Sequence, residues 1–318
     1  MRALRRRRLR VLLGLAALCA LGLLGAVAWL LRDPVPRWRE RGSRLVAVEE
    51  GPALVAGGAA YQPARLRAAS GLEVDVLVRP PPAAEPKARR PLYLLVGGYR
   101  TGERAATLVG DAPGAIVAAL GYPYDGPTDV RGLAVLPRLP AIRRAVLDTP
   151  PAIRLALDWL LARPDVDPTR VELVGVSFGA FFAPAAAALD SRVTRLWIVH
   201  GAARPREVLE RGLEPWIGWG PARALVAAAA DVVLGGPALA PERWVPRVAP
   251  RPVVMINALD DARLPRSAVE ALHASAHEPS EVVWVDGGHV HPERPDLIAA
   301  LMDVVLERAG EPRGQLER

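Results

Sequence analysis

The sequence Gly-Val-Ser-Phe-Gly at residues 175–179 places one hydroxyl between two glycines, directly after an apolar segment that begins at Val171. A serine on a very tight strand-to-helix turn needs small neighbours, and Gly175 and Gly179 remove side chains that would collide there. Such a turn would hold the Ser177 hydroxyl above a sheet, next to the free N–H groups of a helix N-terminus. The pattern predicts a nucleophilic serine, although an ordinary glycine-rich turn would have the same sequence.

A serine nucleophile needs a general base, and the chain has five histidines. His289 follows an apolar segment and the pair Gly287-Gly288, which would let the loop bend back over the sheet. His291 lies in the same loop, and we predict that His289 is the base. A metal site at His-x-His would need carboxylate partners at suitable spacing, and the sequence has none there, so we expect no metal.

The other three histidines fit the role of base less well. His200 follows an apolar segment in Ile-Val-His-Gly. His273 and His277 are four residues apart on a predicted helix, which suits a solvated helix face better than a metal pair.

The acid that orients the base should also follow a strand. Asp260 and Asp261 follow an apolar segment that begins at Val253, and both precede Leu264-Pro265. A carboxylate there would fix the imidazole tautomer and stabilise the imidazolium that forms during the reaction. One of the two could instead cap the next helix.

Stabilisation of an oxyanion needs N–H donors that are already in place. The amide of Phe178, directly after the nucleophile, is one candidate. The second should come from the loop Gly97-Gly98-Tyr99 after an earlier strand, and the amide of Tyr99 is our prediction. A plain glycine-rich turn is the alternative for this loop.

Short apolar segments alternate with helical ones along most of the chain. Segments typical of strands lie at residues 72–78, 92–96, 115–120, 171–174, 195–199, 253–256 and 282–285, and helical spacing occurs at 150–161 and 297–306. This alternation predicts a mostly parallel sheet with helices on both faces. Residues 204–247 interrupt it with a helical, tryptophan-bearing insert, which could be a lid over the strand ends or a packing element.

At this point the chain resembles the α/β-hydrolases, specifically the serine hydrolases of the dienelactone-hydrolase and prolyl-oligopeptidase-like branch. The similar segments are DWLLARPDVDPTRVELVGVSFGA, MINALDDARLP and DGGHV, in the order serine, aspartate, histidine. The resemblance implies an α/β-hydrolase domain over residues 71–310 that needs no cofactor. It also selects Asp261 as the acid, because Asp261 stands four residues before Pro265. The family often has His-Gly where this chain has Gly97-Gly98, which weakens the oxyanion prediction.

The net charge of +7 does not indicate a nucleic-acid partner. Residues 1–32 hold seven arginines and no acid, so 34 of the 41 basic residues remain to balance the 34 acidic ones elsewhere. The folded part is therefore neutral, and no basic patch is expected.

The arginines cluster instead beside an uncharged segment. Residues 1–10 form a basic tail, and residues 11–31 are an uncharged run that would make a helix roughly 31 Å long, about the thickness of a bilayer core. We expect a single-pass transmembrane helix or uncleaved signal anchor, with the tail in the cytoplasm, residues 32–70 as a juxtamembrane segment and the catalytic domain outside. A cleaved signal peptide is the alternative.

The sequence thus predicts a membrane-anchored serine hydrolase that cleaves an ester or related acyl bond through Ser177, Asp261 and His289. The expected partners are a small-molecule or peptide acyl substrate and the membrane, without nucleic acid. Two alternatives stay open: a serine peptidase of prolyl-oligopeptidase type, and a non-catalytic membrane-tethered binding module on a hydrolase scaffold.

Overall fold

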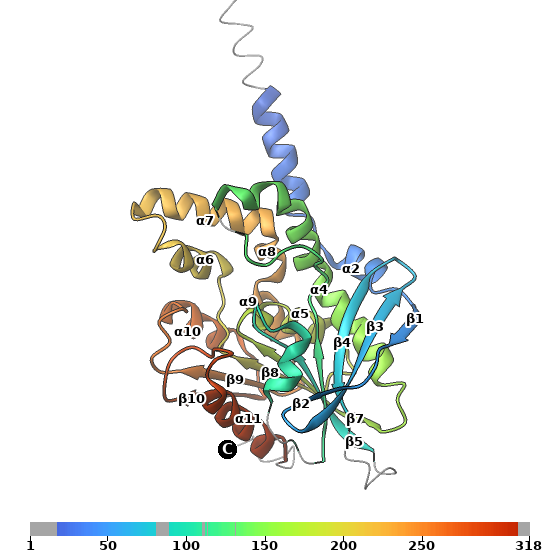
Figure 1. The fold of residues 1–318 in the computed structure, drawn as a ribbon. Coiled ribbons are helices and arrows are strands. Elements are labelled where there is room, and N and C mark those ends of the chain that lie inside the picture. The colour runs from blue at the N-terminus through green and yellow to red at the C-terminus, as the bar shows by residue number, and fades with distance from the viewer. Residues whose placement is uncertain (1–17, 81–88, 110–111, 113, 131, 311–318) are drawn as a thin grey trace, which may run out of the picture.

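The computed structural model describes residues 18–80, 89–109, 112, 114–130 and 132–310. A ten-stranded sheet in the order β1-β3-β4-β6-β5-β7-β8-β9-β10, with β2 paired to β3, forms its centre (Figure 1). The strands are β1 Leu45–Glu50, β2 Leu54–Ala56, β3 Ala59–Ala68, β4 Glu73–Arg79, β5 Arg90–Val96, β6 Ile116–Leu120, β7 Val166–Val176, β8 Arg195–Val199, β9 Val253–Ala258 and β10 Ser280–Val285.

Helices connect the strands of the second half of the sheet. The helices are α2 Val35–Arg41, α3 Ala105–Leu108, α4 Leu139–Leu160, α5 Ala183–Leu189, α6 Pro205–Leu213, α7 Gly220–Leu234, α8 Gly236–Leu239, α9 Pro241–Trp244, α10 Arg266–Ser275 and α11 Pro295–Gly310. Short 3-10 turns are η1 Gly102–Arg104, η2 Gly132–Arg138, η3 Ser177–Phe181 and η4 Val245–Arg247.

The six strands from β6 to β10 in the sheet order pair in parallel, whereas β1, β3 and β4 are antiparallel. Parallel strands place their carboxyl ends at one edge of the sheet, where such folds bind ligands. The segments after β5, β7, β8 and β9 therefore meet at this edge. These segments contain the predicted oxyanion loop, the predicted nucleophile, His200 and the paired aspartates.

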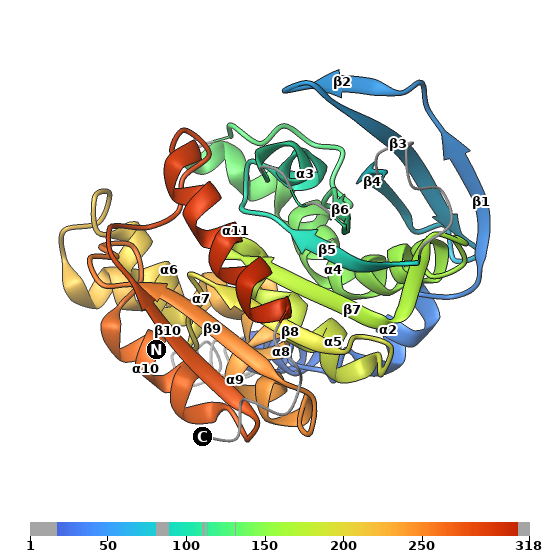
Figure 2. The ribbon, with the colours of Figure 1, turned by 90° about the horizontal axis from the view of Figure 1, so that it is seen from below.

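Alternate side chains of each central strand enter different cores. Leu92 and Leu94 of β5 belong to a core shared with α4 and α5, whereas Tyr93 and Leu95 belong to one shared with α3 and α11. Figure 2 shows α4 and α5 on one face of the sheet and α11 on the other. The predicted two-sided covering of a mostly parallel sheet is confirmed.

The sheet begins earlier than the sequence indicated. Residues 32–70 were expected to be a juxtamembrane segment separate from a domain at 71–310, but β1, β2 and β3 lie in this segment and extend the domain's sheet. This boundary was wrong because the two shorter strands, β1 and β2, are largely exposed and lack a strong apolar pattern.

Helix α2 is also part of the domain. The Asp148 carboxylate of α4 is 2% exposed and pairs with the guanidinium groups of Arg41, at 2.7 Å, and Arg37, at 3.3 Å. The ring of Trp38 packs 5.6 Å from the ring of Trp244, and both are buried. An ion pair and an aromatic contact therefore join the N-terminal region to α4 and to the insert at residues 204–247.

The insert is helical, as predicted, and forms α6 to α9 and η4. Its Trp244 is buried in the core, but Trp216 and Trp219 are exposed. None of its described residues lines the cavity beside Ser177. A lid that closes this cavity is therefore not the arrangement seen in the structure.

The predicted membrane span at residues 11–31 is described only from Leu18 onward, and the basic tail at residues 1–10 lies outside the described residues. Within the described part of the chain, no single helix has both the length and the apolarity needed to cross a membrane. The helix Leu18–Leu30 and α2 satisfy the criteria only as a pair, with a bend of 56° between them.

We expect Asp148→Ala to lower the free energy of unfolding by about 3 kcal/mol, because it leaves two arginines next to a buried site without their partner. The matched control is Asp75→Ala, which breaks the exposed pair with Arg65 and should cost less than about 1 kcal/mol. Equilibrium chemical denaturation measures both. Equal losses would show that the Asp148 pair does not hold α2 to α4.

Candidate active site

Ser177 lies on a strained turn between β7 and η3. Its φ angle is +53°, a left-handed value that few residues other than glycine adopt. A Cβ atom at Gly179 would overlap the carbonyl group of Val96, and one at Gly175 would lie 2.7 Å from Cβ of Ala183. Both glycines are therefore required by the close approach of β5, β7 and α5, which is the steric reason predicted for them.

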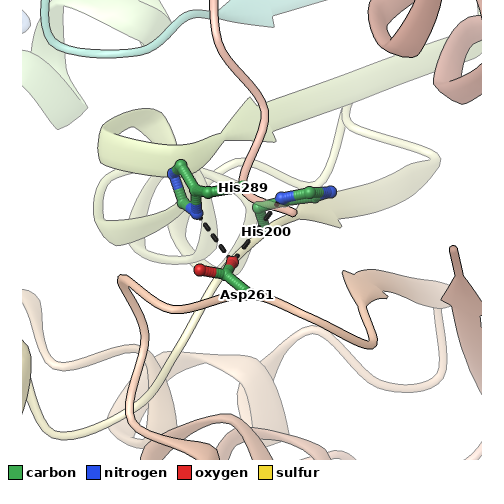
Figure 3. Close-up of side chains that lie close together, drawn as sticks. All are labelled: His200, Asp261 and His289. Carbon is green, nitrogen blue, oxygen red and sulfur yellow. Dashed lines mark hydrogen bonds and ion pairs between the residues drawn. The ribbon is translucent and has the colours of Figure 1, made fainter. Parts of the chain in front are cut away.

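A chain of two short hydrogen bonds starts at the Ser177 hydroxyl. Ser177 Oγ is 2.7 Å from His289 Nε2, and His289 Nδ1 is 2.7 Å from Asp261 Oδ2 (Figure 3 shows the second contact). Because the ionised carboxylate can only accept, Nδ1–H donates to Asp261 and Nε2 accepts the serine hydroxyl. The His289 and Asp261 side chains are 7% and 5% exposed, so water barely reaches this contact.

The structure distinguishes the two aspartates. Asp261 Oδ1 accepts hydrogen bonds from the backbone N–H groups of Arg263, at 2.9 Å, and Leu264, at 3.2 Å. Burial by itself would raise the Asp261 pKa, but its contact with His289 and these N–H groups lower it below the ordinary value. Asp261 therefore stays ionised near neutral pH, whereas Asp260 is exposed.

The predicted oxyanion loop lies beside Ser177. Gly97, Gly98 and Tyr99 line the same cavity as Ser177. The rings of Tyr99 and Phe178 meet edge to face with centroids 5.7 Å apart, and the Tyr99 hydroxyl donates to the carbonyl of Thr128. The structure thus brings together the two segments whose amides we predicted as donors.

A second histidine, His200, to which the sequence assigned no role, contacts this cluster. Its φ angle is +51°, its side chain is fully buried, and its ring packs 5.2 Å from the ring of His289. His200 Nδ1 accepts the backbone N–H of Val290 at 3.0 Å and lies 3.6 Å from Asp261 Oδ2 (Figure 3). The position of His200 directly after a buried strand was the only signal in the sequence.

His200 is a neutral support for the loop that carries His289. Burial, together with the neighbouring His289, lowers the His200 pKa to about 4, and the charge of Asp261 offsets this only in part. Since Nδ1 accepts from Val290, the proton of the neutral ring resides on Nε2. The hydrogen bond fixes the residue that follows His289 and thereby helps hold the His289 ring against Ser177.

Among the described residues, potential metal-ligand atoms of His200, Asp261 and His289 lie within 4.8 Å of one another. Hydrogen bonds within the protein account for the positions of all three side chains.

The remaining histidines do not reach Ser177. His291 is 39% exposed, and its Nδ1 accepts the backbone N–H of Glu293 at 3.3 Å. His273 bonds through Nε2 to Asn257, and His277 is exposed. Of the two candidates in the last loop, the geometry selects His289.

A cavity of about 610 Å³ opens beside Ser177. It extends from Gly98 along the sheet to the inner side of α11, where Leu301, Met302 and Val305 line it together with Leu95 and Val174. These side chains are apolar and buried. The cavity can therefore hold an apolar group with one end at the serine hydroxyl. The rest of the wall includes the charged side chains of Arg100, Arg104, Arg263 and Glu293.

No family model and no curated relative matches the sequence. Solved structures do match its fold. Acetyl xylan esterase 1 from Thermoanaerobacterium sp. JW/SL YS485 gives a TM-score of 0.60 at 18% identity, over 88% of this chain and 94% of that one. A cold-adapted esterase from an Arctic intertidal metagenomic library gives 0.55 at 20%, over 83% and 100%.

A puromycin-hydrolysing peptidase of Mycobacterium tuberculosis is also similar, with a TM-score of 0.55 at 19% identity. The similarity covers 82% of this chain and 41% of that one. Together with the sheet order and the strand-to-helix turn at Ser177, these matches confirm the predicted α/β-hydrolase fold.

The low pKa of His200 predicts an acid-sensitive stability. Between the ordinary pKa of 6.5 and about 4, the unfolded chain binds a proton at His200 that the folded chain does not, so acidification favours unfolding. Between pH 7 and pH 4.5, the wild type should lose about 2 kcal/mol more unfolding free energy than His200→Asn. Asparagine also tolerates the left-handed backbone.

The exposed His277→Asn is the control and should behave as the wild type in the same denaturation series. An unchanged pH dependence in His200→Asn would mean that His200 is not held neutral in the folded chain.

Proposed function

We propose that this protein is a serine hydrolase that cleaves carboxylic esters. The observation that carries the proposal is the hydrogen-bond chain from Ser177 through His289 to Asp261, with Ser177 on the wall of a cavity whose inner part is apolar. The three residues come from three separate loops at the carboxyl edge of one parallel sheet. Their polar atoms have the orientation that nucleophile, base and acid require.

The contacts support a two-step acyl transfer. Ser177 Oγ attacks the ester carbonyl carbon while its proton passes to His289 Nε2, and the imidazolium then protonates the leaving alkoxide as the C–O bond breaks. A water molecule attacks the acyl-enzyme, and His289 takes the proton of that water and returns it to Ser177 Oγ as the acid leaves. Asp261, ionised and buried, stabilises the imidazolium in both steps.

The amides of Phe178 and Tyr99 would stabilise the oxyanion. Phe178 N–H belongs to the first turn after the nucleophile, and the Tyr99 loop packs against the Phe178 ring. Removing one donor of this kind commonly costs catalysis a factor of about 10² to 10³. No group other than these residues is required for the reaction as written.

The cavity supports an ester whose acyl part is apolar, because the part of the cavity between the sheet and α11 is lined by aliphatic side chains of β5, β7 and α11. Two of the structural neighbours are described as esterases, which agrees with this reaction class.

The proposal includes attachment to a membrane through the N-terminal segment. An uncharged run at residues 11–31 follows six arginines in the first ten residues. In the described part of this run, Leu18, Leu21, Leu23 and Leu24 are each exposed by about two thirds. Exposed leucines on an isolated helix suit a lipid environment, and the arginines favour a cytoplasmic tail with the catalytic domain on the other side.

Ser177→Ala and His289→Ala should each abolish turnover of p-nitrophenyl esters, because the hydroxyl and the base act as a unit. Asp261→Asn should lower kcat by about 10⁴, since the amide favours the wrong imidazole tautomer. The adjacent, exposed Asp260→Asn is the matched control and should retain most activity.

Steady-state kinetics with esters of increasing acyl length, beside matched amides, test the reaction and the substrate class together. Equal losses in the two aspartate variants would contradict the assignment of Asp261. Faster turnover of the amides than of the esters would identify a peptidase.

A further inference from the structure

The insert and the turn η2 each expose large apolar side chains, which together are called here the apolar cap. Its members are exposed by 42% to 82%: Leu133 and Leu136 of η2, Trp216 and Trp219 before α7, and Leu225 and Val226 of α7. Soluble proteins rarely expose so many large apolar side chains within two neighbouring segments, and such patches mark interaction surfaces.

The exposed face of α7 carries no charge. Pro221, Leu225 and Ala229 recur at intervals of four residues and are all exposed, with Val226 beside them. The two charged residues of α7 do not belong to this exposed face. Arg223 donates to the carbonyl of Ile217, and Asp231 lines a separate pocket with Pro237. A surface helix normally presents polar residues to water, so this face is suited to an apolar partner.

The segment Gly132–Arg138 of the apolar cap contains no acid, and Arg138 and Arg144 are exposed at and just beyond its end. The exposed acid next to Trp216, Glu214, forms an ion pair with Arg211 at 3.1 Å. Exposed arginines beside apolar side chains are the combination that favours an anionic lipid surface.

The cap is directly joined to the N-terminal helix Leu18–Leu30. The Arg143 guanidinium donates to the carbonyl of Leu30 at 2.8 Å and to those of Val232 and Val233 at 2.9 and 2.7 Å. It also lies 5.9 Å from the centre of the Trp29 ring. One side chain thus fixes the end of the apolar helix against the C-terminal end of α7.

The directions of the N-terminal helix and of α7 indicate how the domain would face a bilayer. The N-terminal helix leaves the domain at the end where α7 lies, and α7 runs across its direction (Figure 1). If the N-terminal helix enters a bilayer, α7 is therefore oriented along the membrane plane at the level where the helix emerges. Tryptophan is the residue preferred at this level, because its ring is apolar and its N–H can reach water.

We propose that the apolar cap docks onto the lipid surface beside the N-terminal helix, with Trp216 and Trp219 at the headgroup level. The inference rests on the proposed membrane attachment and deepens it. The catalytic domain contacts the bilayer in one fixed orientation, instead of being attached only through a flexible linker. Lipid is favoured over a second copy of the chain because the cap continues the exposed apolar surface of the N-terminal helix.

The test uses the full chain with Cys19→Ala, which removes the single cysteine. Trp219→Cys places an environment-sensitive nitrobenzoxadiazole label on the cap. Val55→Cys places the same label at an equally exposed site on β2, which lies at the opposite end of the domain (Figure 1). Both proteins are reconstituted into vesicles of phosphatidylcholine and phosphatidylglycerol, with or without doxyl-labelled lipid, and ester turnover confirms that they are folded.

The label at position 219 should show blue-shifted emission in vesicles and lose intensity when doxyl lipid is present, whereas the label at position 55 should show neither change. Equal, water-like emission from both labels in chains that float with the vesicles would overturn the docking proposal and leave the membrane attachment intact. Protection from iodide without quenching by doxyl lipid would instead identify a protein partner, such as a second copy. Failure to float with vesicles would overturn both proposals.

Discussion

The close approach of the chain at residues 175–179 to the end of β5 is the constraint on which the site depends. There is no room for a side chain at Gly179 next to the Val96 carbonyl, and little at Gly175 next to Ala183. This packing forces Ser177 into a left-handed backbone conformation and lifts its hydroxyl out of the sheet toward His289. The same contact places Phe178 against Tyr99, so one steric requirement positions both Ser177 and the candidate oxyanion donors. Strain of this kind persists only where the surrounding structure holds it in place.

Two histidines with different roles lie next to the Asp261 carboxylate. His289 forms the short hydrogen bond to Asp261, whereas His200 lies 3.6 Å from the same oxygen and accepts a backbone N–H instead. Burial lowers the pKa of His200 to about 4, so this ring adds no competing positive charge beside Asp261 near neutral pH. Asp261 is then free to stabilise the charge that would form on His289 in the proposed reaction. His200, which supports the loop of His289, is therefore neutral, whereas Asp261, which forms a hydrogen bond with His289, is ionised.

The elements that could be predicted from the sequence are those with a recognisable local pattern of residues. Short apolar segments located the parallel strands, and the glycines around Ser177 and before His289 located two of the loops at the sheet edge. The sequence could not reveal His200, because its role arises from a contact with Val290, 90 residues away in the chain. It also missed the start of the sheet, since β1 and β2 are mostly exposed. The choice between Asp260 and Asp261 came from a family spacing, and its physical basis is the set of N–H groups that only the folded loop provides.

The central claim is that Ser177 is a nucleophile activated by His289. The direct measurement is peptide mapping by mass spectrometry after the chain has reacted with a fluorophosphonate, which forms a stable adduct only with an activated serine. The account predicts one adduct, on the peptide that contains Ser177, and its loss in His289→Ala although the serine is still present. No adduct on Ser177 in the folded wild type, or equal labelling of Ser177 without His289, would contradict the account and indicate a hydrolase fold used for binding.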